Sequence, residues 1–200
     1  MGNRVLSLLA MCALAAACGA GRLSGRAPNF TGRASDGREV RLSDYKGKFV
    51  VLEWFNKDCP FVKKHYSSGN MQKLQADWTG RGVVWFSVIS SAPGKQGYME
   101  AAEVDPHLKE VSAVPTAVIL DPEGTIGKLY GAKTTPHMFV IGLEGDILYG
   151  GAIDDRPTTE PSDVAGAKNY VDAALKDAMA GKPVMNASTV PYGCSVKYKD

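Results

Sequence analysis

Cys59 is the residue in this sequence whose position best suits chemistry. It follows a mostly apolar run, 49–55, that predicts a buried strand, and it precedes Pro60 and a helix-compatible stretch, 61–65. A thiol at the start of a helix lies near free backbone N–H groups and the positive end of the helix dipole. Such a location lowers the pKa of a cysteine and exposes its sulfur as a thiolate. Pro60 also suits the first helical position. The pattern predicts a nucleophilic cysteine, and the alternative is an inert buried one.

Ionisable residues near Cys59 in the sequence could support that chemistry. Glu53 stands inside the apolar run, where an acid is costly without a role or a partner. We expect it to exchange protons with Cys59, and the alternative is a solvent-facing position on an edge strand. Lys63 and Lys64 are expected on a solvated face, although cations within a turn or two also favour a thiolate. His137 is expected to be partly buried and hydrogen-bonded rather than a ligand or proton donor.

The first 20 residues have the pattern of a secretory signal. Arg4 precedes an apolar stretch, 5–17, and small residues follow it. The segment Ala15-Ala16-Ala17-Cys18 resembles a bacterial lipoprotein box, so we expect either lipidation at Cys18 or ordinary cleavage nearby. Residues 21–27 would then form a linker. This pattern predicts export to the bacterial periplasm or the outer face of a membrane. The protein would contact the membrane only through a lipid anchor at Cys18.

Two of the four cysteines, Cys59 and Cys194, remain outside the expected signal. Export would place them in an oxidising compartment. Cys194 lies in residues 181–200, which are expected to form an irregular, mobile tail. It could resolve an oxidised Cys59, form a standing structural disulfide, or stay unpaired. Sequence separation does not decide, because the entropy of closing a long loop grows only slowly with length.

Charge and histidine spacing exclude other classes of function. The formal net charge is +2 and the 23 basic residues are scattered, which gives no case for nucleic-acid binding. The three histidines have no metal-ligand spacing with one another, and no organic cofactor is implied.

The order of elements predicts one α/β domain over residues 28–180. A hairpin is expected at 29–42, and strands alternate with helical stretches after it. Such an order indicates a central mixed sheet flanked by helices. Strands are expected at 49–55, 83–89, 116–120, 137–141 and 147–153, and helices from Pro60, around 71–78, and at 99–112, 126–130 and 163–180.

These residues resemble the thioredoxin fold, and within it the redoxin or AhpC/TSA branch. The resemblance covers about residues 26–180. Glu53 stands six residues before Cys59, as the buried acid of thioredoxins does, and Cys59-Pro60 resembles the Cys-Pro of peroxiredoxins. Thr135-Pro136 before a strand resembles the cis-proline that faces the active cysteine in this fold. The N-terminal part of the domain also resembles that of redoxins, in the segments Ala27-Pro28-Asn29-Phe30, Asp36-Gly37 and 42–48.

The sequence also departs from its relatives' motifs. Val62 stands where thioredoxins have their second cysteine, and Leu52 and Asn56 replace the proline and threonine of the peroxiredoxin motif. The Asn56 amide could substitute for the missing hydroxyl.

The resemblance implies an exported thiol oxidoreductase of the redoxin class. It would reduce peroxides or disulfides through Cys59, with Glu53, Asn56, Pro136 and Cys194 as the other site residues and an external thiol as reductant. The alternative is a redox-inactive binding module. A metal-carrying version would hold a soft ion such as Cu(I) through Cys59, His137 and perhaps Cys194.

Overall fold

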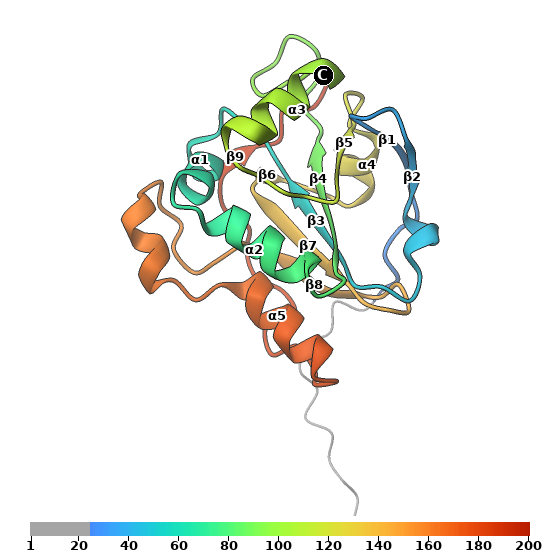
Figure 1. Cartoon of the computed structure of the whole chain (residues 1–200), viewed down its shortest axis with the longest axis vertical. Helices are drawn as coiled ribbons and strands as arrows, with labels where there is room; N and C mark the ends of the chain where they lie inside the picture. Colours follow the sequence, from blue (N-terminus) through green and yellow to red (C-terminus); the bar gives the residue numbers. More distant parts are fainter. Residues whose placement is uncertain (1–24) are drawn as a thin grey trace, which may run out of the picture.

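The computed structural model of the chain describes residues 25–200, which fold around a seven-stranded mixed sheet (Figure 1). The expected signal, Cys18 and most of the expected linker lie outside these residues. The strand order is β2-β1-β5-β4-β3-β7-β8, and a separate two-stranded sheet pairs β6 with β9. The strands are β1 (Thr31–Ala34), β2 (Glu39–Arg41), β3 (Val50–Trp54), β4 (Val84–Ile89), β5 (Ala117–Leu120), β6 (Thr134–Thr135), β7 (His137–Ile141), β8 (Ile147–Gly151) and β9 (Cys194–Ser195).

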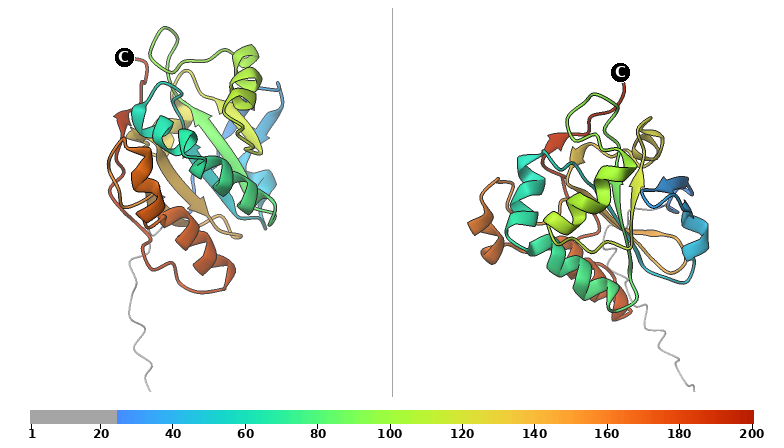
Figure 2. Two further views of the ribbon diagram at one scale, coloured as in Figure 1. Left: turned by 60° about the vertical axis from the view of Figure 1, so that its left-hand side comes forward. Right: turned by 45° about the horizontal axis from the view of Figure 1, so that its top comes forward.

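Helices cover both faces of the sheet (Figures 1 and 2). One core cluster lies beneath α1, α2, α3 and α5, and a second lies on the opposite face with α4. No helix in residues 25–200 has the length and apolar character needed to cross a bilayer. The α-helices are α1 (Pro60–Ser67), α2 (Asn70–Thr79), α3 (Ala101–Glu110), α4 (Thr125–Leu129) and α5 (Tyr170–Met179), and 3-10 turns span Leu42–Tyr45 and Pro161–Gly166.

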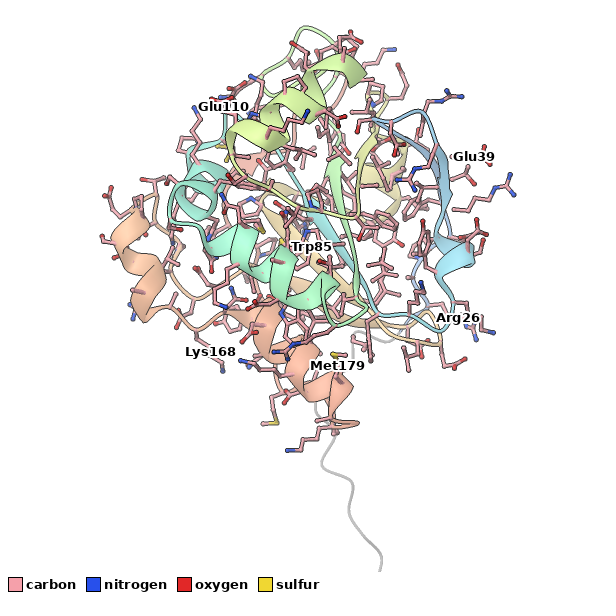
Figure 3. The ribbon with its side chains drawn as sticks, viewed as in Figure 1. Arg26, Glu39, Trp85, Glu110, Lys168 and Met179 are labelled. Atoms are coloured by element: carbon pink, nitrogen blue, oxygen red, sulfur yellow. The ribbon has the colours of Figure 1, made fainter. Side chains whose placement is uncertain are left out.

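Strand β3 is an interior strand of the sheet, between β4 and β7, and leads to the loop that carries Cys59. It pairs in parallel with β4 and antiparallel with β7, and all five of its residues are buried. Because alternate residues of a strand face opposite sides, Val51 packs beneath α1 and α2 while Leu52 and Trp54 pack on the other face. Trp85 of β4 lies in the middle of the molecule (Figure 3) and is fully buried. This packed strand fixes the position of the helix that follows it.

The expected helix at 163–180 is wrong in its first half. A 3-10 turn occupies Pro161–Gly166, and α5 begins only at Tyr170. Asn169 caps the helix, because its side-chain oxygen accepts a hydrogen bond from the backbone N–H of Asp172 at 2.9 Å. The inward-facing residues of α5 are therefore Val171, Ala174 and Leu175.

The expected mobile tail at 181–200 is also wrong, because the end of the chain is docked on the fold. The Val196 backbone N–H donates to the Lys133 carbonyl at 3.1 Å, and the Ala92 N–H donates to the Lys197 carbonyl at 2.8 Å. The Tyr198 hydroxyl donates to the Ala132 carbonyl at 2.8 Å. The tail thereby adds β9 beside β6, next to α1 (Figure 1).

Candidate active site

Cys59 is the N-cap of α1, as the sequence predicts. Its backbone is extended (φ −73°, ψ 124°), Pro60 occupies the first turn, and the Cys59 carbonyl accepts the first helical hydrogen bonds, from Val62 and Lys63. The expected exposure of the sulfur is wrong, however, because Cys59 is 0% exposed. Its thiol donates a hydrogen bond to the Thr135 carbonyl at 3.0 Å. The cover over the sulfur therefore comes from residues distant in sequence.

The bond between Thr135 and Pro136 is cis, as the resemblance implies. Thr135 is the last residue of β6, and its backbone carbonyl points toward the Cys59 sulfur. The Thr135 hydroxyl is buried without a hydrogen-bond partner, and Thr135 lowers the pKa of the Cys59 thiol. The Thr135–Pro136 segment is thus the wall that faces Cys59.

The structure brings Cys194 to Cys59. Strand β9 pairs antiparallel with β6, so that Cys194 stands opposite Thr135. Both cysteines are free thiols, and the Cys194 side chain lies within hydrogen-bonding reach of the Cys59 sulfur. Cys194 is partly exposed, whereas Cys59 is buried beneath it. A pair of thiols in contact can be oxidised to a disulfide with the loss of two electrons and two protons.

The two thiols differ in acidity. Burial raises the pKa of the Cys59 thiol, but hydrogen bonds from the Cys194 side chain and from Thr135 stabilise its thiolate and leave its pKa below the usual value. Burial raises the pKa of Cys194 to about 11, and its hydrogen bond to Cys59 adds to the effect. Cys59 is therefore the thiol of the pair that ionises first.

Gly193 permits the close approach of the two strands. A side-chain Cβ at this position would lie 2.1 Å from the Thr135 carbonyl oxygen, and the Gly193 φ of 139° is one that other residues rarely adopt. Gly193 is not among the site residues predicted from the sequence, although its place directly before the tail cysteine was an available signal.

Glu53 lies in the core beneath α1 and α2, away from solvent. Four side chains donate hydrogen bonds to its carboxylate: Tyr66 at 2.8 Å, Trp85 at 2.8 Å, Ser87 at 3.0 Å and Gln75 at 3.2 Å. Burial raises its pKa, and these four bonds offset part of the rise. Among residues 25–200 no hydrogen bond joins Glu53 to Cys59, so proton exchange between them stays a prediction.

Asn56 has its polar groups engaged within the loop before Cys59. Its amide nitrogen donates to the Gln96 carbonyl at 3.1 Å, and its side-chain oxygen accepts from the Asp58 backbone N–H at 2.9 Å. These bonds hold the loop that carries the cysteine. A role for this amide in orienting a peroxide stays a prediction.

The expectation that both lysines of α1 are solvated is wrong for Lys64. Lys63 is exposed, but Lys64 is 1% exposed and donates to the Arg156 carbonyl at 2.6 Å. His137 is buried, and its Nδ1 accepts a hydrogen bond from the Lys133 backbone at 3.2 Å, which agrees with the sequence-based expectation. Among residues 25–200, neither Lys64 nor His137 forms a hydrogen bond to a thiol.

Residues 25–200 contain no group of three or more His, Cys, Asp or Glu side chains arranged to hold a metal ion. The three-ligand version of the copper-carrier alternative is therefore not assembled in this part of the chain, and a version that uses fewer ligands stays a prediction.

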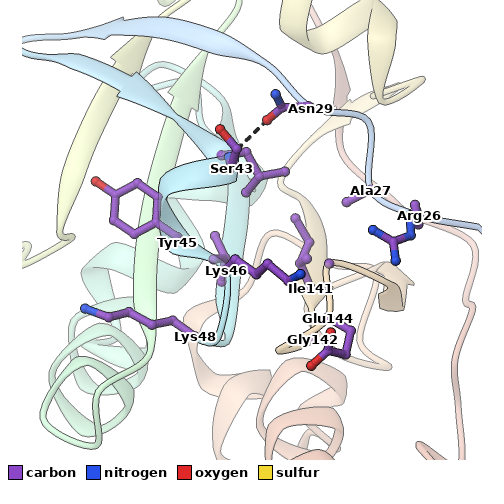
Figure 4. Close-up of a pocket in the computed structure, with 13 residues that line it drawn as sticks. Arg26, Ala27, Asn29, Ser43, Tyr45, Lys46, Lys48, Ile141, Gly142 and Glu144 are labelled. Atoms are coloured by element: carbon purple, nitrogen blue, oxygen red, sulfur yellow. Dashed lines mark hydrogen bonds between the residues drawn. The ribbon is translucent and has the colours of Figure 1, made fainter.

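The molecule also has a cavity far from the two cysteines. It has a volume of about 280 Å³ and lies where β3 begins and β7 ends, beside Val50 and Ile141 (Figure 4). Arg26, Lys46 and Glu144 stand at its exposed rim. Since Cys59 follows the opposite end of β3, this cavity is separate from the thiol pair.

Comparison with known proteins identifies the family of this chain and supports its fold. Residues 23–149 match the model of the AhpC/TSA family. The solved structure of an uncharacterized conserved protein from Geobacillus kaustophilus superposes with a TM-score of 0.74 at 25% identity, covering 88% of this chain and 91% of that one.

Named relatives are oxidoreductases. The thiol-disulfide oxidoreductase ResA of Bacillus subtilis is 27% identical over 123 residues, which is 56% of this chain and 69% of that protein. Other ResA proteins are aligned over 65% of their length. A thioredoxin peroxidase of Fasciola hepatica is 51% identical over 39 residues, 18% of this chain and 20% of that protein.

Proposed function

This chain belongs to the AhpC/TSA family, with a thioredoxin-like fold, and we propose that it is a thiol–disulfide oxidoreductase whose redox couple is Cys59 and Cys194. The observation that carries the proposal is the placement of Cys194 beside Cys59 by the pairing of β9 with β6, at the start of α1 and beside the cis Pro136. The motif lacks a second cysteine at Val62, and the docked tail supplies one from elsewhere in the chain. The couple is thus formed by tertiary structure rather than by neighbouring residues.

The proposed reaction transfers two electrons. The Cys59 thiolate attacks one sulfur of a substrate disulfide, and the other sulfur leaves as a thiolate and takes a proton. The Cys194 sulfur, after losing its proton, then attacks Cys59 in the mixed disulfide, which releases the second substrate thiol and leaves a Cys59–Cys194 disulfide. Two equivalents of an external thiol restore the dithiol and leave as their own disulfide.

Peroxide reduction is a second candidate for the same couple. The short match to a thioredoxin peroxidase and the position of a second thiol against Cys59 favour it. The Cys59 thiolate would take one oxygen atom from a hydroperoxide, which leaves as an alcohol or water. The Cys194 thiol would then condense with the sulfenic acid and release water.

Glu53 and Asn56 are assigned supporting positions in this proposal. Glu53 ties β3 to α1, α2 and β4 through its four donors, and it would exchange protons with Cys59 only through intermediates such as water. Asn56 holds the loop before Cys59. Export, and lipidation at Cys18 if it occurs, would place the couple outside the cytoplasm. Fractionation of the native host with mass analysis of the mature N-terminus tests that part.

A glutathione redox titration with non-reducing peptide mapping tests the couple. We expect one Cys59–Cys194 disulfide within the chain, formed and reduced reversibly. Substrate disulfide and hydroperoxide, offered separately to the reduced protein, distinguish the two reactions. Recovery of both thiols free under oxidising buffers, or only disulfides between chains, would contradict the proposal.

A further inference from the structure

A buried polar cluster lies behind the thiol pair, and the proposed reaction does not use it. Its members are Lys64 and His65 of α1, Asp154 in the loop after β8, and Tyr192 of the tail. The side chains of Lys64, His65 and Asp154 are at most 1% exposed. Buried charges of this kind are retained only with partners, because taking them out of water is costly.

Tyr192 connects this cluster to the redox couple. It stands two residues before Cys194, and its hydroxyl donates a hydrogen bond to Oδ1 of Asp154. Its ring lies 5.8 Å from the ring of Phe61 and 5.7 Å from the Lys64 amine, both on α1. The residue that leads into Cys194 is therefore fixed to the helix that begins at Cys59.

His65 completes a directional chain of hydrogen bonds. The Asn70 amide nitrogen can only donate, so Nδ1 of His65 accepts it at 2.9 Å and the ring proton lies on Nε2. Nε2 then donates to the Tyr192 hydroxyl at 3.3 Å, which itself donates to Asp154. Burial lowers the pKa of His65 to about 4, so the ring is neutral near pH 7.

Asp154 is held in place to receive Tyr192. Its Oδ1 also accepts the Arg156 backbone N–H at 2.9 Å. Its Oδ2 has no hydrogen-bond partner but lies 3.8 Å from the Lys64 amine. The carboxylate is thus balanced by one buried cation, and Tyr192 is its only side-chain hydrogen-bond donor among the described residues.

We propose that Tyr192 and Asp154 form a latch that holds Cys194 against Cys59 and controls access to Cys59. Both are positioning residues, since neither touches the reacting sulfur atoms. The inference rests on the proposed Cys59–Cys194 couple. Because Cys59 is 0% exposed while the tail is docked, a bulky reagent reaches it only after the tail opens. The alkylation rate of Cys59 therefore reports the opening equilibrium.

Tyr192→Phe tests the latch while keeping the ring, the buried Lys64 charge and the Asp154 carboxylate. The reduced full-length protein is treated with a bulky maleimide, and peptide mapping follows Cys59 and Cys194 separately. Loss of a hydrogen bond to a charged acceptor should raise the Cys59 rate by roughly tenfold to a hundredfold. The rate at the partly exposed Cys194 should change much less.

Tyr130→Phe is the matched control. It also removes a single tyrosine hydrogen bond, from Tyr130 to the Pro28 carbonyl at 2.7 Å, whose acceptor belongs to the N-terminal segment rather than to the tail, and it keeps the ring that packs in the core. We expect it to leave the Cys59 rate near that of the wild type. Repeating the assay in low urea separates tail opening, which depends weakly on urea, from global unfolding, which depends strongly on it.

Asp154→Asn is a second variant for the same assay, and a folded Asp154→Asn protein should also show a raised alkylation rate at Cys59. Equal Cys59 rates in Tyr192→Phe, Tyr130→Phe and wild type would overturn the latch. A glutathione titration of the wild type tests the couple itself, so the latch can fail while the couple stands. If the titration shows no Cys59–Cys194 disulfide, the proposed function fails first.

Discussion

Replacing Gly193 with alanine should separate the two thiols without altering either one. The new methyl group would lie 2.1 Å from the Thr135 carbonyl oxygen, where ordinary contacts begin at 3.4 Å. The obstacle is backbone rather than a flexible side chain, so the β9 strand itself must move. Cys194, the next residue, would move with it and lose its contact with Cys59.

The size of the effect follows from the displacement. A shift of about 1 Å in a prealigned pair of reacting groups costs roughly a hundredfold in their effective concentration. A hundredfold smaller equilibrium constant for forming the Cys59–Cys194 disulfide corresponds to a reduction potential about 60 mV less negative. The Cys59 pKa should also rise, since the Cys194 hydrogen bond favours the thiolate.

A glutathione titration of both forms measures this shift, and Gly181→Ala supplies the matched control. Gly181 lies in the same C-terminal segment and has a left-handed φ of 68°, but no atom lies within 4 Å of its missing Cβ. It therefore reports backbone strain without the clash. The reasoning would be refuted if Gly193→Ala kept the wild-type potential, or if Gly181→Ala shifted it equally.

Three further predictions concern ionisable groups. Cys194→Ala should raise the pKa of Cys59, measured from the pH dependence of its alkylation, because a donor to the thiolate is lost; an unchanged midpoint would contradict the assigned contact. The pKa of His65 falls from 6.5 to about 4 on folding, so its contribution to stability is present above pH 6.5 and is lost as pH falls toward 4. The loss is about 3 kcal/mol, and in urea unfolding at pH 7 and pH 4 the variant His65→Gln should be less acid-sensitive by that amount. The pKa of Glu53 is raised on folding, so its contribution has the opposite sign and is lost as pH rises above 4.5. Glu53→Gln should weaken that dependence while lowering stability at all pH values, because the new amide cannot accept all four donors; an unaltered pH profile would show that the carboxyl is not the group responsible.

Local features of the site could be predicted from the sequence. The apolar run before Cys59 and the proline after it specify a strand, a corner and a helix start within a dozen residues, and the structure has all three. The Thr135–Pro136 pair was recognisable from its resemblance to a known motif. These predictions succeed because each depends on backbone preferences of neighbouring residues.

Features that depend on distant contacts could not be predicted. Lys64 is charged, so hydropathy predicts an exposed position. Its burial depends on the loop after β8, which supplies the Arg156 carbonyl and Asp154, and on Tyr192 of the tail. The polar, glycine- and proline-containing tail suggested mobility, yet its hydrogen bonds go to segments around residues 92 and 132–135. The expected helix at 163–180 failed because Asn169 provides a stronger start signal than the apolar spacing before it.

The wide sequence separation of the two cysteines couples oxidation to folding. A disulfide between Cys59 and Cys194 would close a loop of about 135 residues, and the chain-entropy relation gives about 5 kcal/mol of stabilisation for such a loop. By thermodynamic linkage, folding stabilises the disulfide by this same free energy. The reduction potential of the disulfide in the folded chain should therefore be lower than in the unfolded chain by on the order of 100 mV. A neighbouring pair of cysteines closes too small a loop to gain much in this way. The oxidised protein should therefore be the more heat-resistant form, and reduction by its partner thiol would loosen most of the domain at once.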